Sequence, residues 1–118
     1  MKDLAPHIIR QRLLIEGFYN INVDEKVINE YFRKIIKALG MNTYGKAVIH
    51  NPGGQCKEIN QGYDAFIPIV ESGIYLGAWT NAKFLSTIIY SCKNFDVNKA
   101  VNLTKEFWKV KEIESLSF

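Results

Sequence analysis

Residues 83–92 constrain the fold most strongly, because their side chains alternate between two faces that are both rich in apolar residues. One face of an extended segment would carry Phe84, Ser86, Ile88, Tyr90 and Cys92, and the other Leu85, Thr87, Ile89 and Ser91. A period of two predicts a β-strand. Since a strand with one face in water normally shows a polar face, we expect this strand to be central in a sheet.

Two amphipathic segments predict helices that cover such a sheet. The first begins after Asp24, a typical N-cap residue, and ends near Gly40, which suits the left-handed position after a helix. Its apolar residues recur at helical spacing and comprise Val27, Ile28, Tyr31, Phe32, Ile35, Ile36 and Leu39. The second begins near Asp96 and extends to about Lys111, with an apolar stripe of Val97, Ala100, Val101, Thr104, Phe107 and Trp108.

Further segments predict strands at residues 11–17, 42–50 and 63–79. The last consists of two β-rich stretches that meet at Glu71-Ser72-Gly73, which allows a bent strand or a tight hairpin. We expect residues 112–118 to form a loosely held tail. The order of elements predicts one α+β domain over residues 1–118: a two-layer sandwich with a mainly antiparallel, four- to five-stranded sheet and two helices on one face.

The composition gives no sign of a nucleic-acid or membrane partner. The formal net charge is +3, and the basic residues are spread along the chain rather than clustered. No apolar run reaches the roughly 20 residues that a transmembrane helix needs, and residues 1–6 lack the apolar stretch of a signal peptide. The cysteines, Cys56 and Cys92, match neither a disulfide framework nor a metal motif. We therefore expect a cytoplasmic protein without a metal site, in which Cys56 is a simple loop thiol.

The stretch Val70-Glu71-Ser72-Gly73-Ile74-Tyr75-Leu76-Gly77-Ala78-Trp79, followed by a strand that ends in Ser91-Cys92, carries a more specific signal. Trp79 lies seven residues after Ser72, and Cys92 lies thirteen residues after Trp79. Together with the order of elements, this pattern resembles the core of the prokaryotic S-adenosylmethionine decarboxylases. The resemblance covers almost the whole chain in element order.

The resemblance implies a self-processing enzyme of polyamine biosynthesis. In the family, the serine hydroxyl, here that of Ser72, attacks the carbonyl of the preceding glutamate, here Glu71, and the chain is cut between the two. The serine becomes a pyruvoyl group, which forms a Schiff base with the substrate amine and serves as the electron sink for decarboxylation. A thiol at the position of Cys92 acts as the proton donor. The family resemblance also implies a homodimer whose sheets meet face to face, with active sites near the interface.

Four positions depart from the family pattern. Gly73 stands where the family has a histidine, and Gly77 where it has a second histidine that assists the elimination step. Asp64 stands at the position of a processing serine, and a carboxylate accepts a proton where a hydroxyl mainly donates one. Asn81 replaces a glutamate that holds the ribose hydroxyls of the substrate, and so loses a charge-assisted hydrogen bond. Trp79 is retained, and we expect it to pack against the substrate.

These departures leave two alternatives open. One keeps the chemistry and changes the substrate from S-adenosylmethionine to ornithine or arginine, with which a neutral Asn81 is compatible. The other is an unprocessed, non-catalytic homologue that binds a ligand or an active relative as a regulatory partner. Ordinary structural roles are the competing interpretation for each candidate: a turn serine at Ser72, a solvated strand residue at Glu71, a small buried thiol at Cys92, core packing at Trp79 and a turn carboxylate at Asp64.

Overall fold

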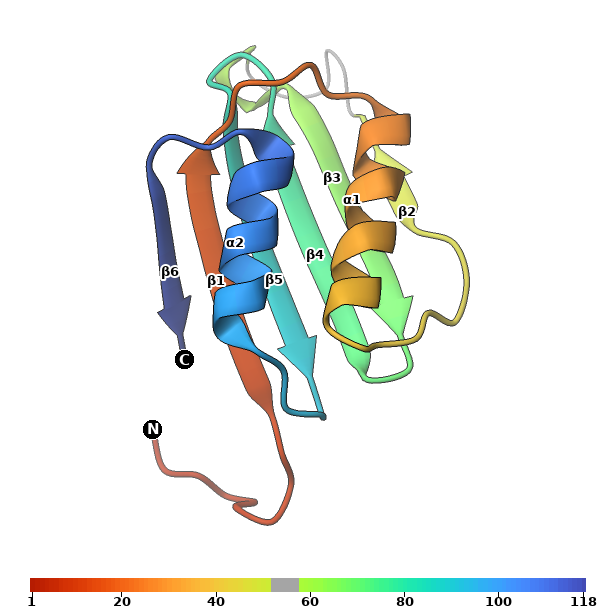
Figure 1. Cartoon of the computed structure of the whole chain (residues 1–118), viewed down its shortest axis with the longest axis vertical. Helices are drawn as coiled ribbons and strands as arrows, with labels where there is room; N and C mark the ends of the chain where they lie inside the picture. The colour runs from red at the N-terminus through yellow and green to blue at the C-terminus, as the bar shows by residue number, and fades with distance from the viewer. Residues whose placement is uncertain (52–57) are drawn as a thin grey trace.

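A computed structural model describes residues 1–51 and 58–118. Within these ranges the strands form one six-stranded sheet in the order β2-β3-β4-β5-β1-β6, with every neighbouring pair antiparallel. Both helices lie on the same face of this sheet (Figure 1). The elements are β1 (Gln11–Phe18), α1 (Glu25–Ala38), β2 (Val48–His50), a 3₁₀ turn (Glu58–Asn60), β3 (Gly62–Ile69), β4 (Ser72–Trp79), β5 (Phe84–Ser91), α2 (Val97–Trp108) and β6 (Ile113–Ser117). The predicted α+β two-layer fold is confirmed.

The central position of β5 is also confirmed, because β5 pairs with β4 on one side and with β1 on the other. Residues 63–79 resolve into the tight hairpin β3–β4, whose register pairs Ile69 with Ser72. Val70 and Glu71 alone connect the two strands. The scissile position expected from the sequence is therefore the junction between a two-residue turn and the first residue of β4.

The strand count and the tail differ from the prediction. Residues 113–117 form β6 along the outer edge of β1, with Gly17 opposite Ile113 and Leu13 opposite Ser117. Without β6, this side of β1 would present a row of unpaired backbone N–H and C=O groups, and pairing with residues 113–117 satisfies them. The side-chain pattern of residues 113–117 does not predict this strand, because four of the five β6 residues are exposed.

The predicted strand over residues 42–50 is wrong for most of its length. Only Val48–His50 is a strand, and Thr43 makes an isolated bridge to Ile69. The Thr43 hydroxyl donates to the Gly45 carbonyl at 2.6 Å and accepts from the Gly45 N–H at 3.0 Å. This local turn competes with strand pairing, as short hydroxyl side chains commonly do. Cys56, expected to be a loop thiol, lies outside the described residues.

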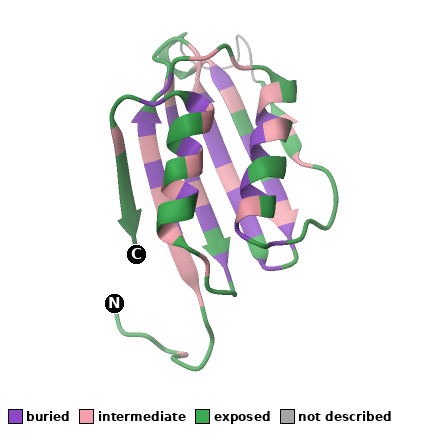
Figure 2. Cartoon of the chain, in the orientation of Figure 1, coloured by how far each residue is buried: buried purple, intermediate pink, exposed green. Residues whose placement is uncertain are grey.

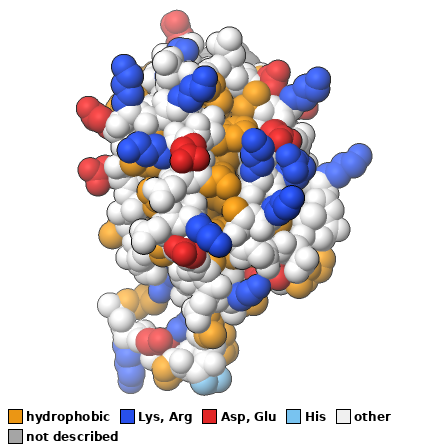
Figure 3. Space-filling model, in the orientation of Figure 1, with side chains coloured by type: hydrophobic (Ala, Val, Ile, Leu, Met, Phe, Trp, Pro, Cys, Tyr) orange, Lys and Arg blue, Asp and Glu red, His pale blue; other side chains and the backbone are white. Residues whose placement is uncertain are grey.

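The core lies between the helices and one face of the sheet (Figure 2). Asp24 caps α1 by accepting from the Val27 N–H at 2.9 Å, and Asp96 caps α2 by accepting from the Lys99 N–H at 3.1 Å. Trp108 is fully buried, and its ring lies 5.4 Å from that of Tyr31. On the helix-covered side, basic and acidic side chains are interspersed around a strip of hydrophobic side chains between the helices (Figure 3).

The opposite face of the sheet is not covered within the described structure. Alternation along the strands places Phe18, Phe66 and Tyr90 on this face, and their exposed fractions are 54%, 44% and 40%. Large apolar side chains exposed together normally mark an interaction surface. We call this surface the helix-free face.

Gly17→Ala is expected to lower the free energy of unfolding by about 1–3 kcal/mol, because the added methyl overpacks the segment that leads into β6. A Cβ at this position would lie 2.5 Å from Cγ1 of Val110 and 2.7 Å from the carbonyl oxygen of Glu112. Gly45→Ala is the matched control, since no atom lies within 4 Å of its added Cβ. Urea denaturation measures both, and equal stabilities would contradict this packing.

Candidate active site

Ser72 is held in a strained backbone conformation. Its φ angle is 141°, a region that residues with a side chain seldom adopt. Such conformations cost of order 1–3 kcal/mol and cluster at functional sites. The positive φ falls on Ser72 itself and not on the neighbouring Gly73. The Ser72 side chain is exposed, so its hydroxyl is open to approach.

Gly73 is explained by packing instead. A Cβ at this position would lie 2.5 Å from Cζ and 2.6 Å from Cε2 of Phe66, so the aromatic ring covers the glycine directly. A histidine in place of Gly73 would displace this ring. The packing of Phe66 against position 73 therefore fits a glycine there and excludes the family's histidine.

Glu71 is fixed at both its backbone and its side chain. Its carbonyl oxygen accepts a hydrogen bond from the backbone N–H of Cys92 at 2.7 Å. Its carboxylate accepts from the backbone N–H of Asn42 at 2.9 Å, which is the main cause that lowers the pKa of Glu71. The peptide carbonyl that precedes Ser72 is therefore both oriented and polarised.

Cys92 follows the last residue of β5 and is exposed, with a free thiol. Because Ser72 pairs with Ser91 across the β4–β5 ladder, Cys92 lies at the same end of the sheet as Glu71 and Ser72. The structure thus brings together the three residues that the sequence proposes as catalytic.

A hollow of about 320 Å³ adjoins Ser72 on the helix-free face. Apart from Ser72, it is lined by Phe66, Gly73, Tyr75, Ile88 and Tyr90. Its walls are aromatic and aliphatic, and no charged side chain lines it. Such a hollow fits a flat or apolar group better than a cationic one.

Trp79 and Asn81 lie away from Ser72 within the chain. Trp79 ends β4, seven residues from Ser72, a separation of about 23 Å along a strand. Its indole N–H donates to Oδ1 of Asn60 at 3.4 Å, and the Asn81 amide donates to the Glu58 carbonyl at 2.7 Å. The two predicted substrate-binding residues therefore cannot reach a group bound at Ser72 of the same chain.

Asp64 pairs across the β3–β4 ladder with Gly77 and accepts a hydrogen bond from the Tyr75 hydroxyl at 2.9 Å. Burial, together with the neighbouring Asp64 carboxylate, raises the pKa of Tyr75 to about 12. A Cβ at Gly77 would lie 3.0 Å from the Tyr75 hydroxyl oxygen and 3.0 Å from the Trp79 ring. These two side chains thus occupy the space that a side chain at position 77 would need.

Sequence reasoning missed three residues of this region. Asn42 is a loop residue with no local pattern, and only the tertiary contact reveals that it holds Glu71. Phe66 and Tyr75 have a detectable period-two signal: Phe66 shares a face with Asp64, and Tyr75 shares a face with Gly73 and Gly77, opposite to the buried apolar residues of their strands. In the described part of the chain, no group of three or more His, Cys, Asp or Glu side chains is placed to hold a metal ion. None of the described helices has the length and apolar character to cross a bilayer.

The fold is similar to that of a decarboxylase of known structure. The crystal structure of the adenosylmethionine decarboxylase from Aquifex aeolicus VF5 matches with a TM-score of 0.71 and 14% sequence identity, over 94% of this chain and 89% of that one. A family model described as S-adenosylmethionine decarboxylase matches residues 14–118. The chain belongs to the S-adenosylmethionine decarboxylase family. A search of curated proteins gives no match.

Glu71 should make acid stability depend on its contact with Asn42. The carboxylate has a pKa below its usual 4.5, so its contribution to stability is complete above pH 4.5 and is lost as the pH falls through the lowered value. In a Ser72→Ala background, which keeps the chain intact, we expect Glu71→Gln to flatten the decline of unfolding free energy below pH 4.5. Urea denaturation over a pH series measures this, and parallel curves for the two proteins would contradict it.

Proposed function

We propose that this chain is a pyruvoyl-dependent decarboxylase that cleaves itself between Glu71 and Ser72. The observation that carries the proposal is the geometry of one peptide link: a serine with a φ of 141° follows a carbonyl that accepts the Cys92 N–H at 2.7 Å. A plain turn serine needs neither the strain nor the aligned donor. The family match supports the same assignment.

The first step transfers the Glu71 acyl group from nitrogen to oxygen. The Ser72 Oγ attacks the Glu71 carbonyl carbon, the C–N bond breaks, and an ester with a free Ser72 amine results. Negative charge develops on the carbonyl oxygen during the attack, and the Cys92 N–H is already directed at that oxygen. Breaking the peptide link also releases the backbone strain at Ser72.

The second step breaks the chain by elimination. A base removes the α-proton of Ser72, the Cβ–O bond breaks, and Glu71 leaves as a carboxylate. The resulting enamine tautomerises to an imine, and water replaces its nitrogen as ammonia leaves. Residues 72–118 then begin with a pyruvoyl ketone, and no oxidant or reductant is consumed.

The residues around the new N-terminus fit this group. A pyruvoyl ketone binds the substrate amine covalently and withdraws electrons as the carboxylate departs as CO₂. The hollow beside Ser72 would hold the remainder of the substrate. Cys92, which is exposed at the same end of the sheet as Ser72, would return the proton. Because no acidic side chain lines the hollow, its chemistry favours S-adenosylmethionine over ornithine or arginine.

A homodimer is part of this proposal. Two copies that meet through their helix-free faces would bury the exposed aromatic side chains of both. Trp79 and Asn81 could then contact the substrate only from the partner, because they lie at the other end of the sheet from Ser72. The sheets would pack about 10 Å apart, as in other β-sandwiches.

The second candidate is an unprocessed homologue that binds a ligand or an active relative. The observation that favours it is Gly77, where Tyr75 and Trp79 fill the space of the family's histidine. It predicts an intact chain.

Intact mass under denaturing conditions separates the two candidates. We expect fragments 1–71 and 72–118, the second blocked by a ketone that reacts with a hydrazide probe, and Ser72→Ala should give one full-length chain. Release of CO₂ from carboxyl-labelled S-adenosylmethionine, ornithine and arginine then identifies the substrate. A single full-length species in fresh and aged wild-type samples would reject the enzyme.

Cys92→Ala should separate processing from turnover. The backbone N–H that contacts Glu71 is retained in this variant, so we expect self-cleavage at close to the wild-type rate. Loss of the thiol should lower decarboxylase turnover by about 100-fold or more. Cys56→Ala is the matched control and should change neither rate. Equal losses of cleavage and turnover in Cys92→Ala would contradict the role as proton donor.

A further inference from the structure

Lys93 connects the end of β5 to the end of α1. Its Nζ donates to the Gly40 carbonyl oxygen at 3.0 Å, and Gly40, with a φ of 66°, follows the C-cap of α1. The backbone of Lys93 is fixed in turn, because its N–H donates to the Ser91 hydroxyl at 2.9 Å. A lysine ammonium has three donors. Within the described structure only one of them is used, by Gly40.

The neighbours of Lys93 hold Glu71 at two points. Asn42, two residues after Gly40, donates its backbone N–H to the Glu71 carboxylate at 2.9 Å. Cys92, the residue before Lys93, donates its backbone N–H to the Glu71 carbonyl oxygen at 2.7 Å. The side chain and the main chain of Glu71 are therefore both bound next to the anchoring points of Lys93.

The positive charge of Lys93 acts on Glu71 without forming an ion pair. The Asn42 N–H is the main cause that lowers the pKa of Glu71, and among the described residues Lys93 is the one charged side chain that adds to this shift. Neither ion pair found in the described part of the chain includes Lys93. Its charge is therefore close to Glu71 and is not neutralised by a carboxylate in contact with it.

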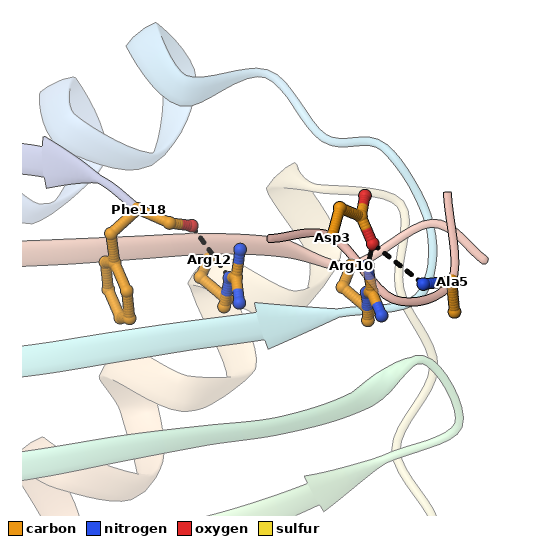
Figure 4. A network of polar contacts seen from close by, with 5 residues as sticks. All are labelled: Asp3, Ala5, Arg10, Arg12 and Phe118. Carbon is orange, nitrogen blue, oxygen red and sulfur yellow. Dashed lines mark hydrogen bonds and ion pairs between the residues drawn. The ribbon is translucent and has the colours of Figure 1, made fainter. Parts of the chain in front are cut away.

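The arginines at this end of the sheet have other partners. Figure 4 shows Arg10 paired with Asp3, and it shows Arg12 beside the main chain of Phe118. The Arg12 Nε donates to the Phe118 carbonyl oxygen at 2.7 Å. These contacts direct both guanidinium groups away from the β3–β4 turn, so Lys93 is the cation that the fold keeps beside Glu71.

The elimination step of self-cleavage creates a negative charge at this place. While the peptide link or the ester is intact, the only charge on Glu71 is that of its side chain. When the Cβ–O bond of Ser72 breaks, its electron pair goes to the departing group, and Glu71 becomes a terminal residue with two carboxylates. Like charges so close together disfavour each other unless a cation lies nearby.

We propose that Lys93 stabilises the departing carboxylate of Glu71 and thereby accelerates the elimination step rather than the acyl shift before it. The inference rests on the proposed function and adds a residue to its second step. The base takes the α-proton of Ser72, the carboxylate takes the electron pair of the broken bond, and Lys93 keeps its own proton throughout. A fixed charge placed where charge develops lowers the barrier of that step.

A purely structural role for Lys93 predicts a different intermediate. The contact with Gly40 also places a cation at the C-terminus of α1, where it is favourable. If this were the whole role, loss of Lys93 would loosen Asn42 and Glu71, and the peptide link would stay unreacted. Loss of a charge needed only for elimination would instead leave the ester intact.

Hydroxylamine distinguishes the ester from the peptide link, because it cleaves the ester. Lys93→Met removes the charge, and Lys93→Gln removes the charge but keeps a donor. We expect both variants to form the pyruvoyl fragment at least tenfold more slowly than the wild type. Treatment of the folded proteins with hydroxylamine should then release residues 1–71 as a hydroxamate and residues 72–118 with an unmodified serine, both measured by intact mass.

Two further variants serve as controls. Lys93→Arg keeps the charge and should restore most of the rate of pyruvoyl formation. Lys37→Met removes a cation from the last turn of α1, and Lys37 does not contribute to the lowered pKa of Glu71. This variant should leave self-cleavage unchanged, and urea denaturation verifies that all four variants are folded.

The possible results separate this inference from the proposed function. A wild-type chain that gives no fragments, with or without hydroxylamine, rejects the enzyme and the role of Lys93 together. If the wild type is cut, cleavage of Lys93→Met at the wild-type rate overturns the inference alone. Slow cleavage of Lys93→Met without an ester that hydroxylamine releases also overturns it, because Lys93 then acts before the elimination.

Discussion

The fold depends on a sheet that is apolar on both faces but covered by helices on only one. Burial of one face against α1 and α2 supplies the core, with Leu13, Leu76 and Leu85 fully buried. The second face retains exposed aromatic and aliphatic side chains, and burying them would lower the free energy of the protein. The hollow beside Ser72 lies on this second face, so the proposed chemistry and the proposed dimer contact share one surface.

The β3–β4 turn places backbone strain at the link between Glu71 and Ser72. Two residues reverse the chain, and the cost of this tight reversal appears as the positive φ of Ser72. Asn42 and Cys92 hold Glu71 from two other segments, so the turn cannot relax by moving away from β5. Strain that the surroundings maintain is available to a reaction that breaks the strained link.

The departures from the family pattern have a structural logic. Phe66 lies over Gly73, and Tyr75 and Trp79 fill the space above Gly77, so both glycines accompany larger neighbours. On the helix-free face, aromatic side chains and the Tyr75 hydroxyl, which is bound to Asp64, therefore stand where the family has two histidine side chains.

Local sequence determined the helices, their caps at Asp24 and Asp96 and the central strand β5, because these follow from side-chain periodicity and short-range spacing. The candidate residues Glu71, Ser72 and Cys92 follow from the resemblance to a family, and their roles stay a prediction. Tertiary structure alone decided that residues 113–117 pair with β1, that Thr43 and Gly45 end the strand predicted at residue 42, and that Asn42 holds Glu71. It also placed the strain on Ser72 rather than on Gly73. These features rest on backbone hydrogen bonds and on contacts between segments far apart in sequence, which leave no periodic trace in the side chains.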